Sequence, residues 1–155
     1  MATTILNQPI SISYSQLSVF DAHLSEPYNE WLPHHSAQGF TWRPGSVSFA
    51  TIVDREACSV VAEVSETAPE SDSANCIIAV PFEVPDGGKI EIGSIMSGVA
   101  VTIPRGQYRL VFFDYGDAKK LRLVFVPEQQ VMPEVVREFG SVRKQSKYLM
   151  SAQPG

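Results

Sequence analysis

Three histidines are the first residues whose type and spacing could support chemistry, because imidazole nitrogens bind metal ions and transfer protons. His34 and His35 are adjacent, His23 lies upstream, and Glu30 is a nearby carboxylate. Neighbouring side chains diverge, however, and no cysteine or third histidine follows at the spacing of zinc ligands. We therefore expect solvated loop histidines, with no metal site and no cofactor.

The two cysteines, Cys58 and Cys76, are the candidate nucleophiles. A catalytic or redox cysteine usually has a nearby histidine or a second cysteine in a Cys-x-x-Cys motif, and the sequence offers neither. Each cysteine instead alternates with apolar residues, over 58–64 and 76–84, as on the inward face of a strand. The pattern predicts two buried free thiols, as is usual in a reducing compartment.

Acidic residues occur in close pairs, which can perform general acid–base catalysis when one member lies in an apolar pocket. Three pairs fall in predicted turns or on outward strand positions: Asp54/Glu56, Glu63/Glu66 and Glu70/Asp72. Motifs for a serine nucleophile elbow or a phosphate-binding loop are also missing. The carboxylates are interpreted as solvated surface or as a binding patch, and no enzymatic activity is predicted.

Charge is unevenly distributed along the 155 residues, whose formal net charge is −5. Residues 1–100 contain twelve acidic and three basic residues, whereas residues 101–155 contain five acidic and nine basic residues. An acidic body repels nucleic acid and attracts basic proteins. We therefore expect a protein partner and no direct contact with nucleic acid.

Alternation of apolar and polar residues dominates the chain and predicts short strands joined by turns. The clearest stretch is residues 89–113, which turns once at Pro104-Arg105-Gly106. About eight or nine such strands predict an all-β, single-domain antiparallel β-sandwich or flattened barrel. A short helix is predicted over residues 33–38, and Trp31, Phe40 and Trp42 are expected to cover one end of the core.

The sequence divides into a β-sandwich domain over residues 1–127 and a C-terminal extension over residues 128–155. Residues 133–140 begin with proline and end with glycine, which predicts a two-turn helix. Residues 141–155 lack a sustained amphipathic period, which predicts a flexible tail. No apolar run approaches the ~18 residues of a membrane helix, and the first residues do not form a secretory signal. We expect a cytoplasmic protein without membrane contact.

Several segments in a fixed order resemble the competence protein J (ComJ) family. They run from about residue 10 to residue 125 and comprise "SISYSQLSVFD" (11–21), Trp31, "GF" (39–40), "GSVSF" (45–49), "VPFEV" (80–84), "IEIGSIMS" (90–97) and "IPRGQYRLVFF" (103–113). Their order and spacing carry the resemblance, most of all the "SISY" and "SIMS" segments. The residues from about 128 onward look like an extension outside the shared pattern.

The resemblance implies an inhibitor that binds and silences a DNA-entry nuclease, a metal-dependent endonuclease of competent bacteria. A nuclease presents a cationic groove to DNA, and an acidic protein can fill that groove with carboxylates in place of phosphates. We therefore expect a basic nuclease as partner. The acidic surface that binds it is predicted to include Glu63, Glu66, Glu70 and Asp72.

Two alternatives remain open at this point. One is an immunity protein that neutralises another basic toxin by the same electrostatic principle. The other is a β-sandwich module that binds a small ligand or lipid in a pocket formed by Trp31, Phe40 and Trp42. A cavity walled by these aromatic residues would favour the module, and copurification of a basic nuclease would favour the inhibitor. The oligomeric state also stays open, because an exposed edge strand can mediate self-association.

Overall fold

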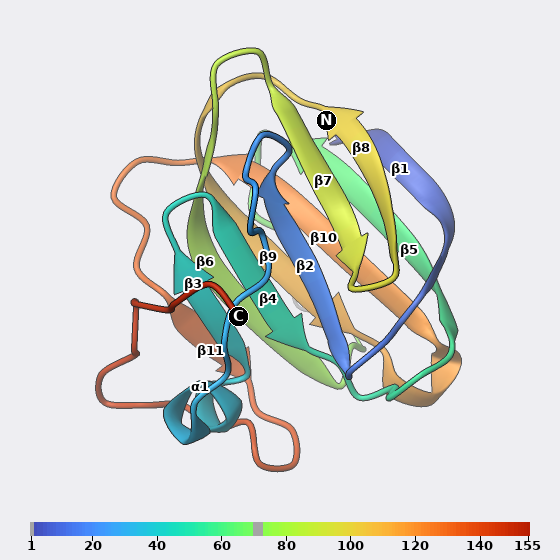
Figure 1. Ribbon diagram of the computed structural model, residues 1–155, viewed down its shortest axis with the longest axis vertical. Helices are drawn as coiled ribbons and strands as arrows, with labels where there is room; N and C mark the ends of the chain where they lie inside the picture. The colour runs from blue at the N-terminus through green and yellow to red at the C-terminus, as the bar shows by residue number, and fades with distance from the viewer. Residues whose placement is uncertain (1, 70–72) are drawn as a thin grey trace.

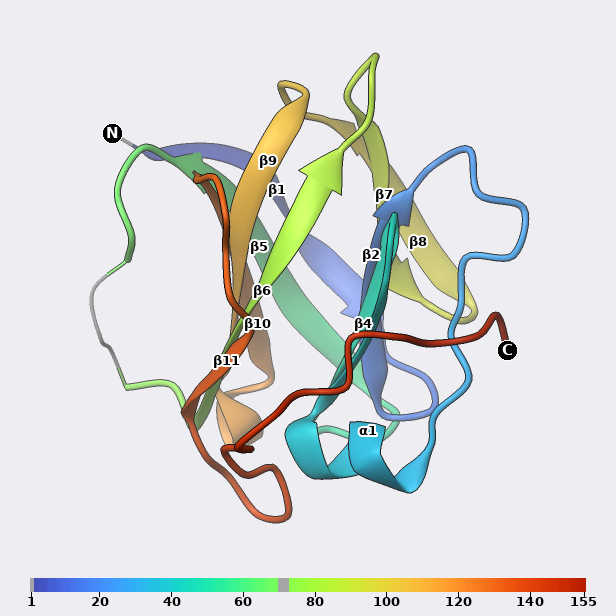
Figure 2. The ribbon, with the colours of Figure 1, turned by 90° about the vertical axis from the view of Figure 1, so that its left-hand side faces the viewer.

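The computed structural model describes residues 2–69 and 73–155, which form two β-sheets facing each other (Figures 1 and 2). The first sheet has six strands in the order β1-β5-β10-β9-β6-β11, and the second has five in the order β3-β4-β2-β7-β8. The strands are β1 (Ala2–Ser11), β2 (Gln16–Asp21), β3 (Phe40–Arg43), β4 (Ser46–Ala50), β5 (Ala57–Ser65), β6 (Cys76–Val84), β7 (Lys89–Ser94), β8 (Ser97–Thr102), β9 (Gly106–Asp114), β10 (Lys120–Pro127) and β11 (Glu134–Arg137). The helical elements are α1 (Pro33–Gln38) and a 3-10 turn, η1 (Gly116–Ala118).

The predicted β-sandwich is confirmed, and so is the short helix at residues 33–38. Gly39 ends this helix in the left-handed conformation, with φ of 82°, as its position after the helix indicates. Strand pairs are antiparallel except for β5 and β10, which run in parallel with Val60 opposite Leu121. Neither helical element in the described residues is long and apolar enough to cross a membrane.

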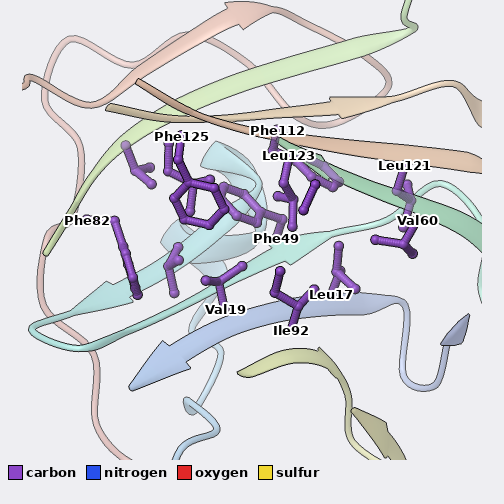
Figure 3. Packing of buried hydrophobic residues seen from close by; sticks show 14 of the residues in the cluster. Leu17, Val19, Phe49, Val60, Phe82, Ile92, Phe112, Leu121, Leu123 and Phe125 are labelled. Carbon is purple, nitrogen blue, oxygen red and sulfur yellow. The ribbon is translucent and has the colours of Figure 1, made fainter. Parts of the chain in front are cut away.

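The core lies between the inner faces of the two sheets, where every second residue of each strand points inward (Figure 3). Phe49 of the five-stranded sheet stacks on Phe112 of the six-stranded sheet, with ring centroids 4.5 Å apart and planes within 8°. Cys58 and Cys76 lie on inward positions of β5 and β6, so the prediction of two buried free thiols is confirmed. The alternation in the sequence therefore identified the face of each strand that builds the core.

A second, smaller apolar cluster covers the outer face of the six-stranded sheet. It explains why the central strand β9 is buried on both faces, from Leu110 through Asp114. The cluster comprises Ala74, Ile77, Ala79, Val111, Phe113, Val124 and Val126. Ala68 and Pro69, from the segment between β5 and β6, lie beside it. This sheet therefore presents less open polar surface than a two-layer sandwich normally does.

Residues 134–137 form the strand β11, and the helix predicted over residues 133–140 is wrong. β11 pairs with β6 and places Val135 opposite Ile78, where Val135 is completely buried. Burying a valine and pairing an open strand edge outweigh the weak helix propensity of a short segment. Pro81 in β6 hinted at an edge strand, but the sequence pattern does not show which segment pairs with that edge.

The last residues return along α1 and the loop before it (Figure 2). The N–H of Leu149 donates to Oε1 of Gln38 at 2.8 Å, and the N–H of Glu30 donates to the carbonyl of Gln153 at 2.7 Å. The segment predicted as a flexible tail thus has defined hydrogen bonds. The division of the chain at residue 127 stays a prediction.

Replacing Phe112 with alanine tests the stacked pair that joins the two sheets. We expect Phe112→Ala to lower the free energy of unfolding by about 3–5 kcal/mol, because a buried ring is lost and a cavity remains opposite Phe49. Urea denaturation measures the change. Met132→Ala is the control, because Met132 is 76% exposed, and it should leave the stability unchanged. An equal effect of both substitutions would contradict this account of the core.

Candidate functional site

The turn between β1 and β2 holds its central residues in an unfavourable backbone conformation. Ser13 and Gln16 form an antiparallel bridge, and between them Tyr14 and Ser15 have φ values of 54° and 52°. A two-residue type I′ turn requires positive φ at both central positions and normally contains asparagine and glycine. A tyrosine in this region costs roughly 1–2 kcal/mol, because its Cβ crowds the following carbonyl. Other contacts must therefore hold the turn.

Hydrogen bonds from two other segments fix this turn. The Ser94 hydroxyl, at the end of β7, accepts the N–H of Ser13 at 2.8 Å and lies 2.7 Å from the carbonyl of Gln16, toward which it donates. On the other side, the carboxylate of Asp54 accepts the hydroxyl of Ser15, and the carbonyl of Asp54 accepts its N–H at 3.2 Å. Backbone strain that the surroundings enforce in this way is typical of functional sites.

The fixed turn presents a large side chain to solvent. Tyr14 is 74% exposed, and Met96, in the turn between β7 and β8, is 81% exposed. The bonds between Ser13 and Ser94 join these two turns, so the "SISY" and "SIMS" segments meet at one corner of the sandwich. We call residues 13–16 and 94–97 the Tyr14 corner. Segments far apart in the sequence thus build one exposed surface.

A groove of about 460 Å³ opens beside the Tyr14 corner. Tyr14 and Trp31 line it together with Phe139 and Val142 from the C-terminal extension. Phe139 is itself 42% exposed. Clustered aromatic side chains at a partly open apolar surface are characteristic of the residues that dominate protein–protein binding. The groove and the corner together form the candidate functional site.

Of the four residues predicted to form the acidic surface, the structure describes Glu63 and Glu66. Glu63 is only 15% exposed, and its carboxylate pairs with Nε of Arg122 at 2.6 Å. The guanidinium of Arg122 also lies over the ring of Phe113, 5.2 Å from its centroid. Glu66 is exposed at the end of β5, and Glu70 and Asp72 lie outside the described residues. Glu63 therefore already has a cationic partner within the fold, and the role of the acidic segment stays a prediction.

Trp31, Phe40 and Trp42 do not form one pocket, so this part of the small-ligand alternative is wrong. Phe40 is completely buried in the core. Trp42 donates its ring N–H to the carbonyl of Pro81 at 2.7 Å and lines a different groove, of about 530 Å³. Trp31 lines the groove beside Tyr14. The chain order of aromatic residues gave no information about which sheet edge each one covers.

The expectation of solvated histidines holds for His23 and His34 but is wrong for His35, which is completely buried. Nδ1 of His35 accepts the N–H of Leu32 at 2.9 Å, and its Nε2 lies 3.0 Å from the carbonyl of Ser151. Nε2 must therefore carry the proton and donate it, which ties α1 to the C-terminal extension. Among residues 2–69 and 73–155, no three His, Cys, Asp or Glu side chains are grouped to hold a metal ion.

The buried ionisable groups near the groove are structural in character. Burial, together with the charge of Asp114, raises the pKa of the Cys76 thiol to about 12. Burial also raises the pKa of Asp114, although its carboxylate accepts the N–H groups of Ile52 and Gly116, which lower it. Asp114 on β9 thereby binds the chain that follows β4 in the other sheet. Its oxygens are occupied by backbone donors, so they do not point to acid–base chemistry.

Comparison with known proteins decides the family of this chain. A family model described as competence protein J (ComJ) matches residues 9–126. The chain belongs to the ComJ family. The resemblance carried by the "SISY" and "SIMS" segments is thereby confirmed.

Relatives of this ComJ family member include an inhibitor. The DNA-entry nuclease inhibitor of Bacillus subtilis (strain 168) is 30% identical over 104 residues, which cover 66% of this chain and 76% of that protein. The crystal structure of ComJ from Bacillus subtilis, described as an inhibitor of the DNA degrading activity of NucA, superimposes with a TM-score of 0.72. It is 24% identical and covers 83% of this chain and 99% of that chain. The structure of the crocagin biosynthetic gene J product shares the fold, with a TM-score of 0.59, 15% identity and coverage of 83% and 99%.

Sequence reasoning missed the strained turn as a functional feature. The signal was present: "SYSQ" joins two strands without the glycine or asparagine that a two-residue hairpin turn normally needs. The bonds from Ser94 and Asp54 that stabilise the turn come from distant parts of the chain, 81 and 39 residues away. No local pattern reveals them. The ComJ resemblance pointed to both segments without showing that they touch.

Alkylation tests whether the thiol of Cys76 is protonated and unreactive in the native protein. Its pKa of about 12, compared with 9.0 for an ordinary thiol, lowers the thiolate fraction at pH 8 by roughly 1000-fold. We expect iodoacetamide to leave both cysteines unmodified in the native protein and to label both after denaturation, as measured by mass spectrometry. Labelling of native Cys76 as fast as in a peptide would show that the thiol at the groove is reactive.

Proposed function

We propose that this protein is a nuclease inhibitor that acts by binding its target and catalyses no reaction itself. The observation that carries the proposal is the ComJ family match over residues 9–126, because the curated relative is a DNA-entry nuclease inhibitor. Two observations support the absence of catalysis. The carboxylate of Asp114 accepts two backbone N–H groups, and the thiols of Cys58 and Cys76 are buried. We expect the complex to form in the cytoplasm.

The Tyr14 corner is the surface that we assign to the nuclease. An exposed tyrosine supplies a large contact area with little loss of conformational entropy, and an exposed methionine adapts to irregular surfaces. The strain in the turn offers a second argument. A glycine or asparagine at position 14 would relieve the strain at no cost to the core, so the tyrosine is better explained by binding than by folding.

The acidic segment is proposed to act at a second part of the interface. Carboxylates at the rim of an interface accelerate encounter with a basic partner and contribute less to the lifetime of the complex. Glu66, Glu70 and Asp72 form this group, while Glu63 stays paired with Arg122. The basic character of the nuclease is part of the proposal.

Replacing Tyr14 with asparagine separates binding from folding. We expect Tyr14→Asn to raise the melting temperature by about 2–4 °C, because asparagine tolerates positive φ. The same substitution should weaken inhibition of a DNA-entry-type nuclease by roughly 30-fold, as for loss of an interface hot spot. DNA cleavage assays at graded inhibitor concentrations and thermal denaturation provide the two measurements.

Tyr14→Phe is the matched control, because it retains both the ring and the strained backbone. It should leave the melting temperature near that of the native protein and most of the inhibition intact. If Tyr14→Asn inhibits as well as the native protein, the Tyr14 corner is not part of the interface. If the native protein inhibits no nuclease of this type, the proposed function itself fails.

Charge reversal tests the acidic segment. We expect Glu66→Lys, Glu70→Lys and Asp72→Lys together to slow association with the nuclease by at least tenfold and to reduce its salt dependence, because electrostatic steering is lost. The control is the same change of charge on exposed acids elsewhere, at Glu26, Asp86 and Glu128. Stopped-flow or surface-plasmon-resonance rates at several salt concentrations measure the effect. Equal slowing by both triple variants would show that net charge matters and that the segment does not.

A further inference from the structure

The C-terminal extension contacts the edge strands on one side of the sandwich and leaves those on the other side uncovered. On one side lie the edge strands β3 and β11 (Figure 1). Tyr148 of the C-terminal extension contacts both strands. The hydroxyl of Tyr148 accepts the N–H of Val135 in β11 at 2.9 Å, and its ring lies 5.9 Å from the ring of Phe40 in β3. On the opposite side lie the edge strands β1 and β8, which neither α1 nor the extension reaches (Figure 1).

The two strands on the exposed side differ in how they resist pairing. β1 contains Pro9 and an irregularity between Thr4 and Leu6, and both features interrupt a row of hydrogen-bonding groups. β8 (Ser97–Thr102) contains no charged residue and no proline, and its ladder with β7 has no register shift. Proteins normally protect an edge strand with one of these devices. β8 has none of them.

The register shows which backbone groups of β8 are available. The N–H of Ile103 donates to the carbonyl of Gly88 at 3.0 Å, so alternate residues from Ile103 backward face β7. Gly98, Ala100 and Thr102 therefore point their N–H and carbonyl groups away from β7, toward the open edge. All three residues are exposed, and their small side chains permit close approach of another strand. This edge presents a row of backbone donors and acceptors to solvent.

We infer that two copies of this chain pair through β8 in an antiparallel, twofold-symmetric dimer. The twofold axis passes beside Ala100, so Ala100 pairs with its own counterpart and Gly98 pairs with Thr102 of the other copy. Three such residue pairs exchange about six backbone hydrogen bonds, two for each pair. The two five-stranded sheets then continue across the interface. Closed symmetry of this kind is the commonest arrangement of homo-oligomers.

Charges beside the edge are complementary in this arrangement. The carboxylate of Glu91 lies over Gly98, since an added Cβ on Gly98 would stand 2.9 Å from its Oε2. Lys89 stands beside Thr102 in the register of β7 and β8. Glu91 itself stands opposite Ala100, but its carboxylate leans over Gly98. When Gly98 pairs with Thr102 of the other copy, this carboxylate therefore lies in the cross-strand row that contains Lys89 of that copy. Because of the twofold symmetry, this pairing of Glu91 with Lys89 occurs twice in the dimer. It favours a second copy as partner over a strand that carries acidic residues.

The expected dimer is weak and reversible. Pairing of one strand buries less than the roughly 1,200–2,000 Å² of a standard interface. A dissociation constant in the range of about 1–100 μM is therefore expected. Sedimentation equilibrium or light scattering across this concentration range should show conversion from monomer to dimer. No nuclease is needed, so the result is independent of the proposed function.

Replacing Ala100 with proline or threonine tests the geometry. Proline at position 100 removes an outward N–H that no bond to β7 uses, and proline is tolerated at such edge positions. We expect Ala100→Pro to raise the dissociation constant at least tenfold, because the symmetry removes two hydrogen bonds. Ala100→Thr retains the N–H and has a high strand propensity, so it should dimerise like the native protein.

A second variant covers the case in which Ala100→Pro fails to fold. Ala100→Lys retains the backbone groups but places two like charges at the twofold axis, and it should also be monomeric. A native protein that stays monomeric at 100 μM overturns the inference. So does a dimer that both variants leave intact. If the native protein is monomeric while Ala100→Pro loses nuclease inhibition, the edge binds a strand of the nuclease and the dimer is again excluded.

Discussion

Unpaired backbone groups at the edges of its two sheets are the constraint that shapes this protein. A two-layer sandwich has four edge strands, and each must be covered, interrupted or paired. The last part of the C-terminal extension contacts β3 and β11 through Tyr148, and Pro9 and a bulge interrupt β1. Only the edge of β8 has no such device among the described residues. The C-terminal extension therefore helps to protect the sheet edges and is an integral part of the fold.

The same constraint explains the position of the groove. Where the extension crosses from β11 back to α1, the turn at Phe139–Val142 stands beside the end of the sandwich and lines the groove with Tyr14 and Trp31. The family match ends at residue 126, so Phe139 and Val142 lie outside it, whereas Tyr14 and Met96 lie within it. The groove therefore combines Tyr14 and Trp31, which lie inside the range of the family match, with residues of the C-terminal extension that lie outside it. Target selectivity would arise naturally from such a combination.

Much of the fold could be predicted from the sequence, because alternation reports directly on which face of a strand is buried. The alternating stretches over residues 58–64 and 76–84 lie in the strands Ala57–Ser65 and Cys76–Val84, and the helix at 33–38 follows from Pro33 and Gly39. The failures share one physical cause. β11 and the buried His35 both depend on contacts with distant segments, with Ile78 and Ser151 respectively. A local pattern contains no information about such contacts.

The site was less predictable than the fold for a related reason. The acidic composition drew attention to the segment from Glu63 to Asp72, yet the carboxylate of Glu63 forms an ion pair with Arg122 within the fold. In the sequence, the strained turn is marked only by the absence of the glycine or asparagine that such a turn normally contains. The exposed Tyr14 points to a binding role only once the structure shows that Ser94 and Asp54 hold the turn in its strained conformation. Charge and apolar contact also act on different quantities. Carboxylates raise the rate at which a basic target arrives, whereas a desolvated aromatic side chain determines how slowly it leaves. An inhibitor that must keep a nuclease silent depends chiefly on slow dissociation, so the Tyr14 corner should contribute more to inhibition than the acidic segment does.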